Sequence, residues 1–162
     1  MIKTILIFLV SPIILLAQKH NDFESYLLNL SEKFEVEQIT ADSIVQKDLI
    51  LLDTREKEEY DVSHIKNALW VGYDDFKPAR VDSFSRDAEI IVYCSVGYRS
   101  SVIAEKLKEA GFKNVKNLYG GIFNWANEGR AIVNDSTETN KIHCYNNKWG
   151  KFVNNLKLEK IY

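Results

Sequence analysis

The sequence has little of what marks a disulfide-rich, metal-binding or nucleic-acid-binding protein. It contains two cysteines, Cys94 and Cys144, which are too few for a disulfide scaffold, and their spacing matches no zinc pattern. A net charge of −2, with no basic stripe, argues against nucleic acids and anionic membranes as partners, because these select faces rich in lysine and arginine. We find no internal repeat and no low-complexity segment.

The sequence also lacks an apolar run long enough to cross a membrane, which takes about 20 residues. The apolar segment at residues 5–16 follows a single positive charge at Lys3 and precedes the small residue Ala17. We interpret residues 1–17 as a signal peptide, although Leu15 stands where a small residue is usual. The sequence therefore predicts an exported protein, periplasmic or secreted, that is free of the membrane after cleavage. The alternative is an uncleaved anchor or a buried helix.

What remains fits one globular domain. The chain has 162 residues, of which 46% are apolar and 27% charged, close to the average soluble protein. Short apolar segments typical of strands lie at residues 49–52, 68–71, 90–93 and 115–118. Helical segments are predicted between and around them, at residues 22–34, 41–46, 56–60, 100–110 and 122–128. This alternation predicts an α/β fold with a central, mostly parallel sheet of about five strands and helices on both faces.

Two extensions flank the predicted domain, which spans residues 36–133. Residues 18–35 form an N-terminal helical extension. Residues 134–162 form a tail that begins with a polar, loop-like stretch at 134–140. Further along, Trp149, Phe152, Val153 and Leu156 have helical spacing. We expect this part of the tail to dock an apolar face on the domain.

The segment with the clearest chemistry follows the strand at 90–93. Cys94 stands at the carboxyl end of that strand, where parallel sheets bind their ligands. A loop leading into a helix turns backbone N–H groups inward, and these donors, together with the cation of Arg99, favour the thiolate. Gly97 supplies backbone freedom, and Ser100 or Ser101 can cap the helix. The simpler alternative is that Cys94 is a buried structural thiol.

Three motifs resemble a known family. Residues 94–100 (CSVGYRS) resemble the active-site loop of single-domain rhodaneses, C-x-x-G-x-R-S. Residues 51–68 resemble the upstream D-x-R-E, E-Y and H-I-x-x-A motif, with Asn67 where a glycine is usual. Residues 120–125 (GGIFNW) resemble the closing G-G-x-x-x-W element. The resemblance covers residues 36–133.

The resemblance implies a sulfurtransferase. Cys94 would take sulfane sulfur from a small anion such as thiosulfate, carry it as a persulfide, and pass it to cyanide, a thiol or a protein acceptor. Arg99 would hold the anionic donor. The backbone of the loop would bind substrate through Ser95, Val96, Gly97, Tyr98, Arg99 and Ser100. No cofactor or metal is implied, and we expect a monomer with a shallow, open site.

Three further residues of the upstream motif have supporting roles. Asp53 and Arg55 lie at a strand end, and we interpret them as a structural ion pair rather than as catalytic groups. Histidine is a common general base, but we interpret His64 as a hydrogen-bonded structural histidine rather than a general base.

Two other functions stay open at this point. Phosphatases and arsenate reductases of the same fold use the wider spacing C-x5-R, whereas here four residues separate Cys94 from Arg99. A sulfur carrier or a regulatory binding module would share this sequence pattern, although purely regulatory members often lack the cysteine. Cys144 lies outside the resemblance. It is interpreted first as an inert thiol, with intermolecular pairing or a resolving role toward Cys94 as alternatives.

Overall fold

The computed structural model describes residues 12–44 and 49–162, with side chains from Asp22 onward. Of the predicted signal peptide, residues 1–11 lie outside the described part, and its cleavage stays a prediction. Within the described part, no helix has the length and apolar character that a membrane span requires.

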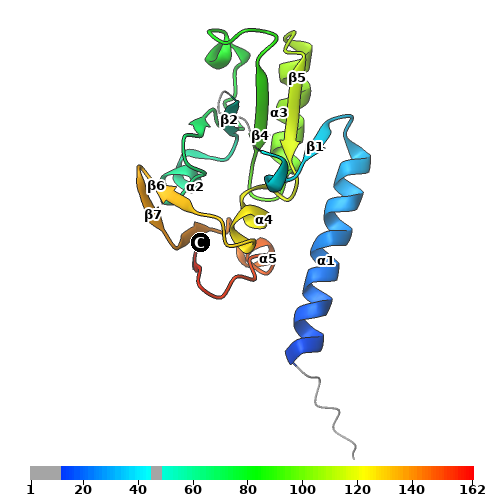
Figure 1. The fold of residues 1–162 in the computed structure, drawn as a ribbon, viewed down its shortest axis with the longest axis vertical. Coiled ribbons are helices and arrows are strands. Elements are labelled where there is room, and N and C mark those ends of the chain that lie inside the picture. Colours follow the sequence, from blue (N-terminus) through cyan, green and yellow to red (C-terminus); the bar gives the residue numbers. More distant parts are fainter. Residues whose placement is uncertain (1–11, 45–48) are drawn as a thin grey trace, which may run out of the picture.

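The helices and strands alternate along the chain as the apolar segments indicate (Figure 1). The strands are β1 (Glu37–Ile39), β2 (Ile50–Asp53), β3 (Leu69–Trp70), β4 (Glu89–Tyr93), β5 (Asn114–Leu118), β6 (Ile132–Asn134), β7 (Thr137–Thr139), β8 (Lys141–His143) and β9 (Glu159–Ile161). The α-helices are α1 (Pro12–Lys33), α2 (Lys57–Val62), α3 (Tyr98–Glu109), α4 (Gly121–Asn127) and α5 (Asn147–Gly150), and short 3-10 turns cover Ala41–Ser43 and Pro78–Val81.

The central sheet has five parallel strands in the order β1-β5-β4-β2-β3, which confirms the predicted α/β architecture. β4 pairs with both β2 and β5, so it lies in the middle of the sheet. Along β4, Ile90 and Val92 belong to one hydrophobic cluster and Ile91 and Tyr93 to the other, because successive side chains point to opposite faces. Burial on both faces explains why this strand is an unbroken apolar run.

Helices cover both faces of the sheet. The cluster that contains Ile90 also takes Ile103, Ala104 and Leu107 from α3. The cluster that contains Ile91 takes residues from α4, from α1 and from the tail. The carboxyl ends of β2 and β4 therefore lie between α3 on one side and α4 with its neighbours on the other.

The tail differs from the prediction. Residues 134–140 contain part of a β6–β7 hairpin instead of a simple loop. The expected helix through 149–156 is only the single turn α5, and β8 and β9 pair in parallel around it. Phe152 and Val153 are buried, but Leu156 is 94% exposed. Helical spacing over a few residues does not specify a helix when Asn146 caps one turn and the backbone then turns away.

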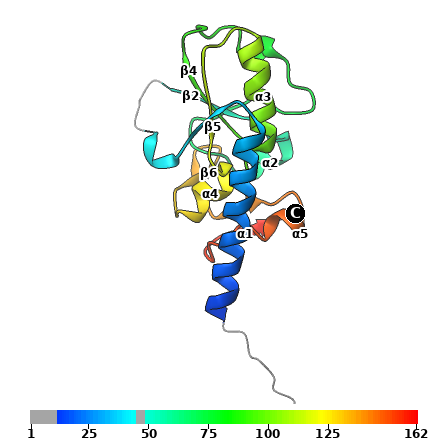
Figure 2. The same cartoon turned by 90° about the vertical axis from the view of Figure 1, so that its right-hand side faces the viewer.

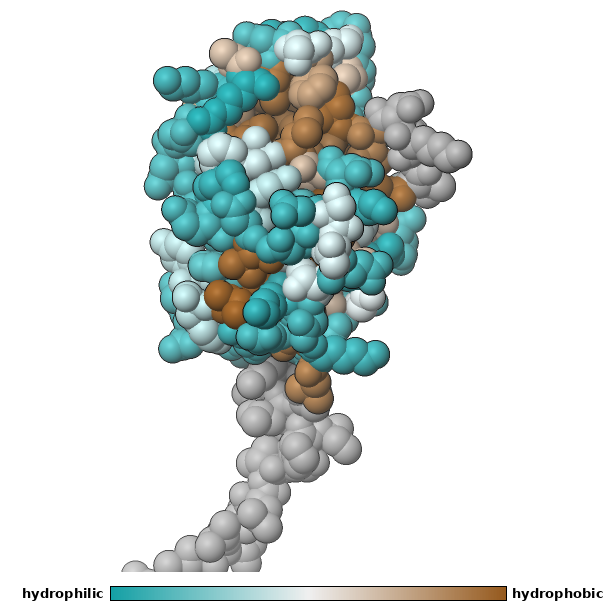
Figure 3. Space-filling view, turned by 90° about the vertical axis from the view of Figure 1, so that its left-hand side faces the viewer, coloured by the Kyte–Doolittle hydropathy of each residue, from teal (hydrophilic) through white to brown (hydrophobic). Residues whose placement is uncertain are grey.

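The tail meets α1 on one side of the domain, where α1 and α5 are neighbours in two perpendicular views (Figures 1 and 2). The rings of Phe23 in α1 and Phe152 in the tail stack with their centroids 4.7 Å apart. The opposite side of the molecule is mostly hydrophilic, with a hydrophobic area in its upper half and a smaller one lower down (Figure 3).

Candidate active site

The loop after β4 turns directly into α3. Cys94 follows the last residue of β4, and α3 begins at Tyr98, two residues earlier than predicted. Gly97 precedes the helix with φ of 110°, a left-handed conformation that glycine adopts without a steric penalty. Ser100 and Ser101 do not cap the helix as predicted. Their hydroxyls instead donate to the Gly97 carbonyl, at 3.1 and 2.9 Å, because the left-handed turn brings that carbonyl over the first turn of the helix.

Cys94 is almost fully enclosed, with 1% of its surface exposed. Its Sγ accepts a hydrogen bond from the Gly97 N–H at 3.1 Å. A backbone donor three residues ahead in the chain stabilises negative charge on this sulfur, and the geometry places the sulfur on the inner side of the loop.

The glycine pair 120–121 holds the loop from behind. At the start of α4, the N–H groups of Ile122 and Phe123 donate to the carbonyls of Cys94 and Ser95, at 2.9 and 3.1 Å. A Cβ on Gly121 would lie 2.2 Å from the Cys94 carbonyl oxygen, so this approach excludes any other residue. In a trans peptide the N–H points opposite to the carbonyl. The N–H groups of the two loop peptides behind these carbonyls are therefore turned away from α4.

Asn117 in β5 fixes the other end of the loop. Its side chain is 1% exposed, and Nδ2 donates to the Gly97 carbonyl at 3.2 Å and to the Ser101 hydroxyl at 3.0 Å. Asn117 was not among the predicted site residues. Its signal was a polar residue inside an otherwise buried strand segment, which predicts a buried hydrogen-bond partner.

Arg99 does not project freely into the site, because Glu59 of α2 binds it. Its two terminal nitrogens donate to the two carboxylate oxygens of Glu59 at 2.6 and 2.8 Å. Ser95 completes the group: its hydroxyl donates to Glu59 at 3.0 Å and accepts from Arg99 at 3.0 Å. Burial alone would raise the pKa of Glu59, but the hydrogen bonds and charge of Arg99 outweigh it and the pKa is lowered.

Glu59 is the glutamate of the E-Y element in the upstream motif. It is 2% exposed, and it also accepts a hydrogen bond from the Glu56 backbone N–H at 3.2 Å, as the N3 residue of a capping box. One carboxylate thus caps α2 and anchors the loop arginine. The box pattern is visible in the sequence, but the pairing with Arg99 joins segments far apart in the chain.

Asp53 and Arg55 form the expected ion pair, and both side chains are fully buried. Arg55 Nη2 donates to Asp53 at 2.6 Å and to the Ser63 carbonyl at 2.6 Å, and the Trp70 indole donates to the Arg55 carbonyl at 2.9 Å. Burial would lower the pKa of Arg55, but the adjacent carboxylate raises it above the ordinary value. The pair ties the end of β2 to the segment after α2.

His64 lies away from the loop, outside the residues that line the pocket around Cys94. Its ring stacks on Tyr60 at 3.9 Å between centroids, and its Nδ1 lies 3.1 Å from the Tyr60 carbonyl oxygen. Its backbone pairs with Val133. These contacts are those of a structural histidine.

Cys94 lies in the wall of a pocket of about 580 Å³. The pocket is larger than the shallow site predicted from short loops, because α1 and the tail add walls that the central domain lacks. Its lining consists of Tyr26, Asn29, Leu30, Lys33, Glu56, Tyr73, Asp74, Cys94, Ser95, Val96, Tyr98, Arg99, Tyr145 and Trp149. Burial, and to a smaller extent the negative charge of a Cys94 thiolate, raises the pKa of Tyr26 to about 12, so the Tyr26 hydroxyl stays protonated at neutral pH.

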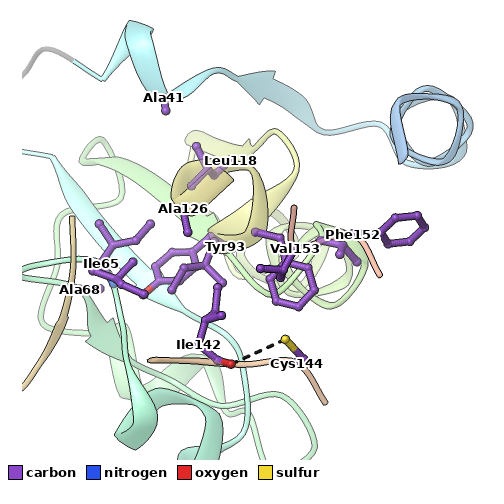
Figure 4. Close-up of a cluster of buried hydrophobic side chains, with 14 of the residues drawn as sticks. Ala41, Ile65, Ala68, Tyr93, Leu118, Ala126, Ile142, Cys144, Phe152 and Val153 are labelled. Atoms are coloured by element: carbon purple, nitrogen blue, oxygen red, sulfur yellow. Dashed lines mark hydrogen bonds between the residues drawn. The ribbon is translucent and has the colours of Figure 1, made fainter. Parts of the chain in front are cut away.

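Cys144 is not part of this pocket. Its sulfur lies in the hydrophobic core and donates weakly to the Ile142 carbonyl at 3.6 Å (Figure 4). Burial raises the pKa of this thiol to about 11, and both cysteines are free. A protonated thiol inside the core matches the inert alternative. Within the described residues, no cluster of three histidine, cysteine or acidic side chains is arranged to hold a metal ion.

Comparison with known proteins places the chain among relatives of the same architecture. It is 34% identical over 108 residues to the adenylyltransferase and sulfurtransferase UBA4 of Candida albicans, covering 61% of this chain and 25% of that protein. It is 32% identical over 108 residues to the tRNA uridine(34) hydroxylase of Pectobacterium carotovorum, covering 64% and 30%. The chain thus corresponds to less than a third of each relative.

Solved structures agree. The rhodanese-like domain of the Alr3790 protein from Anabaena superposes with a TM-score of 0.55 at 25% identity, covering 59% of this chain and 77% of that one. The thiosulfate sulfurtransferase of Pseudomonas aeruginosa shares the fold, with a TM-score of 0.59 at 18% identity over 71% of this chain and 23% of that one. The model of the rhodanese-like domain matches residues 36–128. The chain therefore belongs to the rhodanese-like domain family.

Proposed function

We propose that the protein is a sulfurtransferase that carries sulfane sulfur as a persulfide on Cys94. The observation that carries the proposal is the position of this sulfur, enclosed at the carboxyl end of β4 with the Gly97 N–H directed at it. A relative named as a sulfurtransferase supports the same chemistry.

In the first step, the Cys94 thiolate attacks the outer sulfur of a donor such as thiosulfate. A Cys–S bond to that sulfur forms, the sulfur–sulfur bond of the donor breaks, and sulfite leaves with the electron pair. The terminal sulfur of the persulfide then carries the negative charge. The backbone donors of residues 95–100 stabilise this anion, with Gly97 contributing the contact already present.

In the second step, a nucleophilic acceptor attacks the terminal sulfur of the persulfide. The bond between the two sulfurs breaks, and its electron pair returns to Cys94 as thiolate. Cyanide would leave as thiocyanate, and a thiolate would leave as a new persulfide. The enzyme ends each cycle in its starting state, without a redox cofactor.

Arg99 has two roles in this proposal. It lies in the pocket wall beside Cys94 and attracts an anionic donor, and its pairing with Glu59 holds the loop in place. The carboxylate compensates much of its charge, so anion attraction is weaker than for an unpaired arginine.

The spacing of the loop favours sulfur over phosphorus or arsenic. Four residues between Cys94 and Arg99 make a narrow loop, and a tetrahedral oxyanion with three equatorial oxygens needs more converging donors. A sulfur carrier that serves one protein partner is the second candidate, because it would use the same cysteine and the same loop. Turnover of small donors and acceptors separates it from an enzyme.

The test is transfer from thiosulfate to cyanide by the purified protein, read as thiocyanate, beside Cys94→Ser. We expect activity in the wild type and none in the variant, with one added sulfur atom on Cys94 by mass spectrometry after donor alone. A reduced wild type that neither turns over nor gains sulfur contradicts the proposal, and phosphatase and arsenate assays then decide between the remaining enzymes.

We also propose that the protein is exported after cleavage within residues 1–17 and acts as a monomer. The apolar segment at residues 5–16 supports export. The mass of the protein from periplasmic and culture fractions of its own cells tests cleavage, and sedimentation tests the monomer. An uncleaved protein in the cytoplasmic fraction contradicts export.

A further inference from the structure

Nearly half of the residues that line the pocket come from outside the family segment. The family model matches residues 36–128. The additional wall consists of Tyr26, Asn29, Leu30 and Lys33 of α1 and of Tyr145 and Trp149 of the tail. We refer to these six residues as the terminal wall.

Aromatic contacts hold the terminal wall together. Tyr26 meets Trp149 edge to face with centroids 5.4 Å apart, and Trp149 lies 6.0 Å from Phe152 in the same measure. The tail is attached to the domain through Asn127, whose Nδ2 donates to the Phe152 carbonyl at 2.8 Å and whose Oδ1 accepts from the Asn154 N–H at 2.8 Å. The wall is therefore part of the folded structure.

The size of the pocket exceeds what the smallest substrates need. A volume of about 580 Å³ falls in the range of sites for organic molecules, roughly 300–1,000 Å³. Thiosulfate or cyanide would occupy a small part of it and leave the rings of Tyr26 and Trp149 without contact. An apolar wall stabilises a ligand only when the ligand covers it.

The charges around the pocket do not favour a further anion. The pocket lining contains two carboxylates, Glu56 and Asp74, and the positive charge of Lys33 balances one of them. Arg99 is paired with the buried carboxylate of Glu59. The persulfide on Cys94 keeps the single negative charge of the thiolate and places it on the terminal sulfur, where it repels an anionic acceptor.

We infer that the terminal wall binds the sulfur acceptor and that this acceptor is a low-molecular-mass organic thiol with an apolar body and no anionic group other than its thiol. The inference rests on the proposed function and specifies its second step. The thiolate of the acceptor attacks the terminal persulfide sulfur, the bond to Cys94 breaks, and the organic persulfide leaves. The proton released by the thiol goes to solvent, and the Cys94 thiolate is restored.

The first test compares acceptors on protein whose Cys94 has been loaded with sulfur. Phenylethanethiol, mercaptoethanol and mercaptopropionate differ in apolar body and charge, and each rate is corrected for the thiolate fraction of that thiol. We expect kcat/KM to be highest for phenylethanethiol and lowest for the anionic mercaptopropionate, by roughly tenfold at each step. Equal values, or a preference for the anionic thiol, overturn the inference.

The second test uses two tryptophan substitutions on neighbouring residues of α1. Asn29 is exposed and lines the pocket, whereas Leu28 is 54% exposed and does not line it. Asn29→Trp fills the pocket mouth, and we expect it to lower the ratio of phenylethanethiol transfer to cyanide transfer by roughly tenfold. Leu28→Trp adds the same bulk to the same helix and leaves the ratio as it is. A ratio that falls equally in both variants, or in neither, overturns the inference.

The two proposals fail differently. If donor adds no sulfur to Cys94, the proposed function is wrong and the inference falls with it. If sulfur is loaded and cyanide accepts it, but phenylethanethiol and mercaptopropionate compete equally in wild type and Asn29→Trp, only the inference is wrong. Quenching of tryptophan fluorescence by phenylethanethiol in Cys94→Ser gives an independent measure of binding, and absence of saturable quenching counts against the terminal wall.

Discussion

Glu59→Gln separates the two roles that the structure gives to the loop arginine. The substitution keeps the shape of the side chain and an oxygen that can accept from the Glu56 N–H, but it removes the charge that binds Arg99. The arginine is then left in a site where its side chain is 16% exposed and its partner was 2% exposed. Loss of one partner of a buried pair costs 3–5 kcal/mol as a rule, about 3 kcal/mol here, because Arg99 reaches the pocket edge.

Stability and donor binding should change in opposite directions. Urea denaturation at neutral pH measures the free energy of unfolding, and we expect it to fall by about 3 kcal/mol in Glu59→Gln. The same variant removes the negative charge that compensates Arg99, so the KM for thiosulfate should decrease at low ionic strength and rise again with added salt. Asp74→Asn, which changes a carboxylate that no ion pair engages in the described part of the chain, is the matched control for general charge effects.

The pH dependence gives the sign of the effect. The pKa of Glu59 is lowered in the folded protein from its ordinary value of 4.5, so its contribution to stability is complete above 4.5 and is lost as pH falls below that value. The difference in unfolding free energy between wild type and Glu59→Gln should therefore shrink on acidification from pH 5 toward 3, roughly the titration range of a carboxyl with a lowered pKa. A variant as stable as the wild type at neutral pH, with unchanged KM for thiosulfate, refutes the reasoning.

Three further substitutions or probes test other parts of the site. Asp53→Asn leaves Arg55 fully buried without its carboxylate, and we expect unfolding to become easier by about 3–5 kcal/mol, measured by urea denaturation. Gly121→Ala forces a Cβ to within 2.2 Å of the Cys94 carbonyl oxygen, and we expect it to reduce sulfur transfer strongly. Gly129→Ala is the control, because Gly129 also has a positive φ but nothing lies within 4 Å of its added Cβ, and turnover should stay unchanged. Equal losses in both variants would contradict the role of the contact between Gly121 and the loop. Burial raises the pKa of Cys144 to about 11, so at about pH 8 we expect iodoacetamide to modify Cys94 and to leave Cys144 unmodified. Peptide mapping after the reaction measures this, and alkylated Cys144 in the folded protein would contradict an inert thiol.

The central part of the site follows from local sequence signals. The apolar run at 90–93 is typical of a strand buried on both faces, and a cysteine directly after such a strand is expected at the edge where parallel strands end. Gly97 predicted a turn, and it adopts the left-handed conformation that such a turn requires. The start of α3 was placed two residues late, because serines resemble caps although the glycine turn makes them unnecessary.

Pairings between segments far apart in the chain could not be predicted from local sequence patterns. The contact between Glu59 and Arg99 joins α2 to α3, and neither local pattern contains information about the other. β1 was missed because Glu37–Ile39 is an edge strand whose residues are exposed or half-buried, so no apolar run marks it. In the tail, β8 and β9 form only through their mutual pairing, which a scan for helical spacing does not detect.

The site thus combines two parts with different physical tasks. The loop of residues 94–100 is held by backbone groups at the start of α4 and by the side chain of Asn117, so the Gly97 N–H is directed at the sulfur before any substrate arrives. Such preorganisation determines the chemistry, because no reorganisation is needed when charge develops on sulfur. The terminal wall contacts this loop through side chains: the Lys33 ammonium lies 4.9 Å from the centre of the Tyr98 ring, and the Arg99 guanidinium lies 5.6 Å from the centre of the Tyr145 ring. The donor to the Cys94 sulfur is the backbone N–H of Gly97, so substitutions in the wall can change which acceptor reaches the persulfide while this backbone donor stays in place.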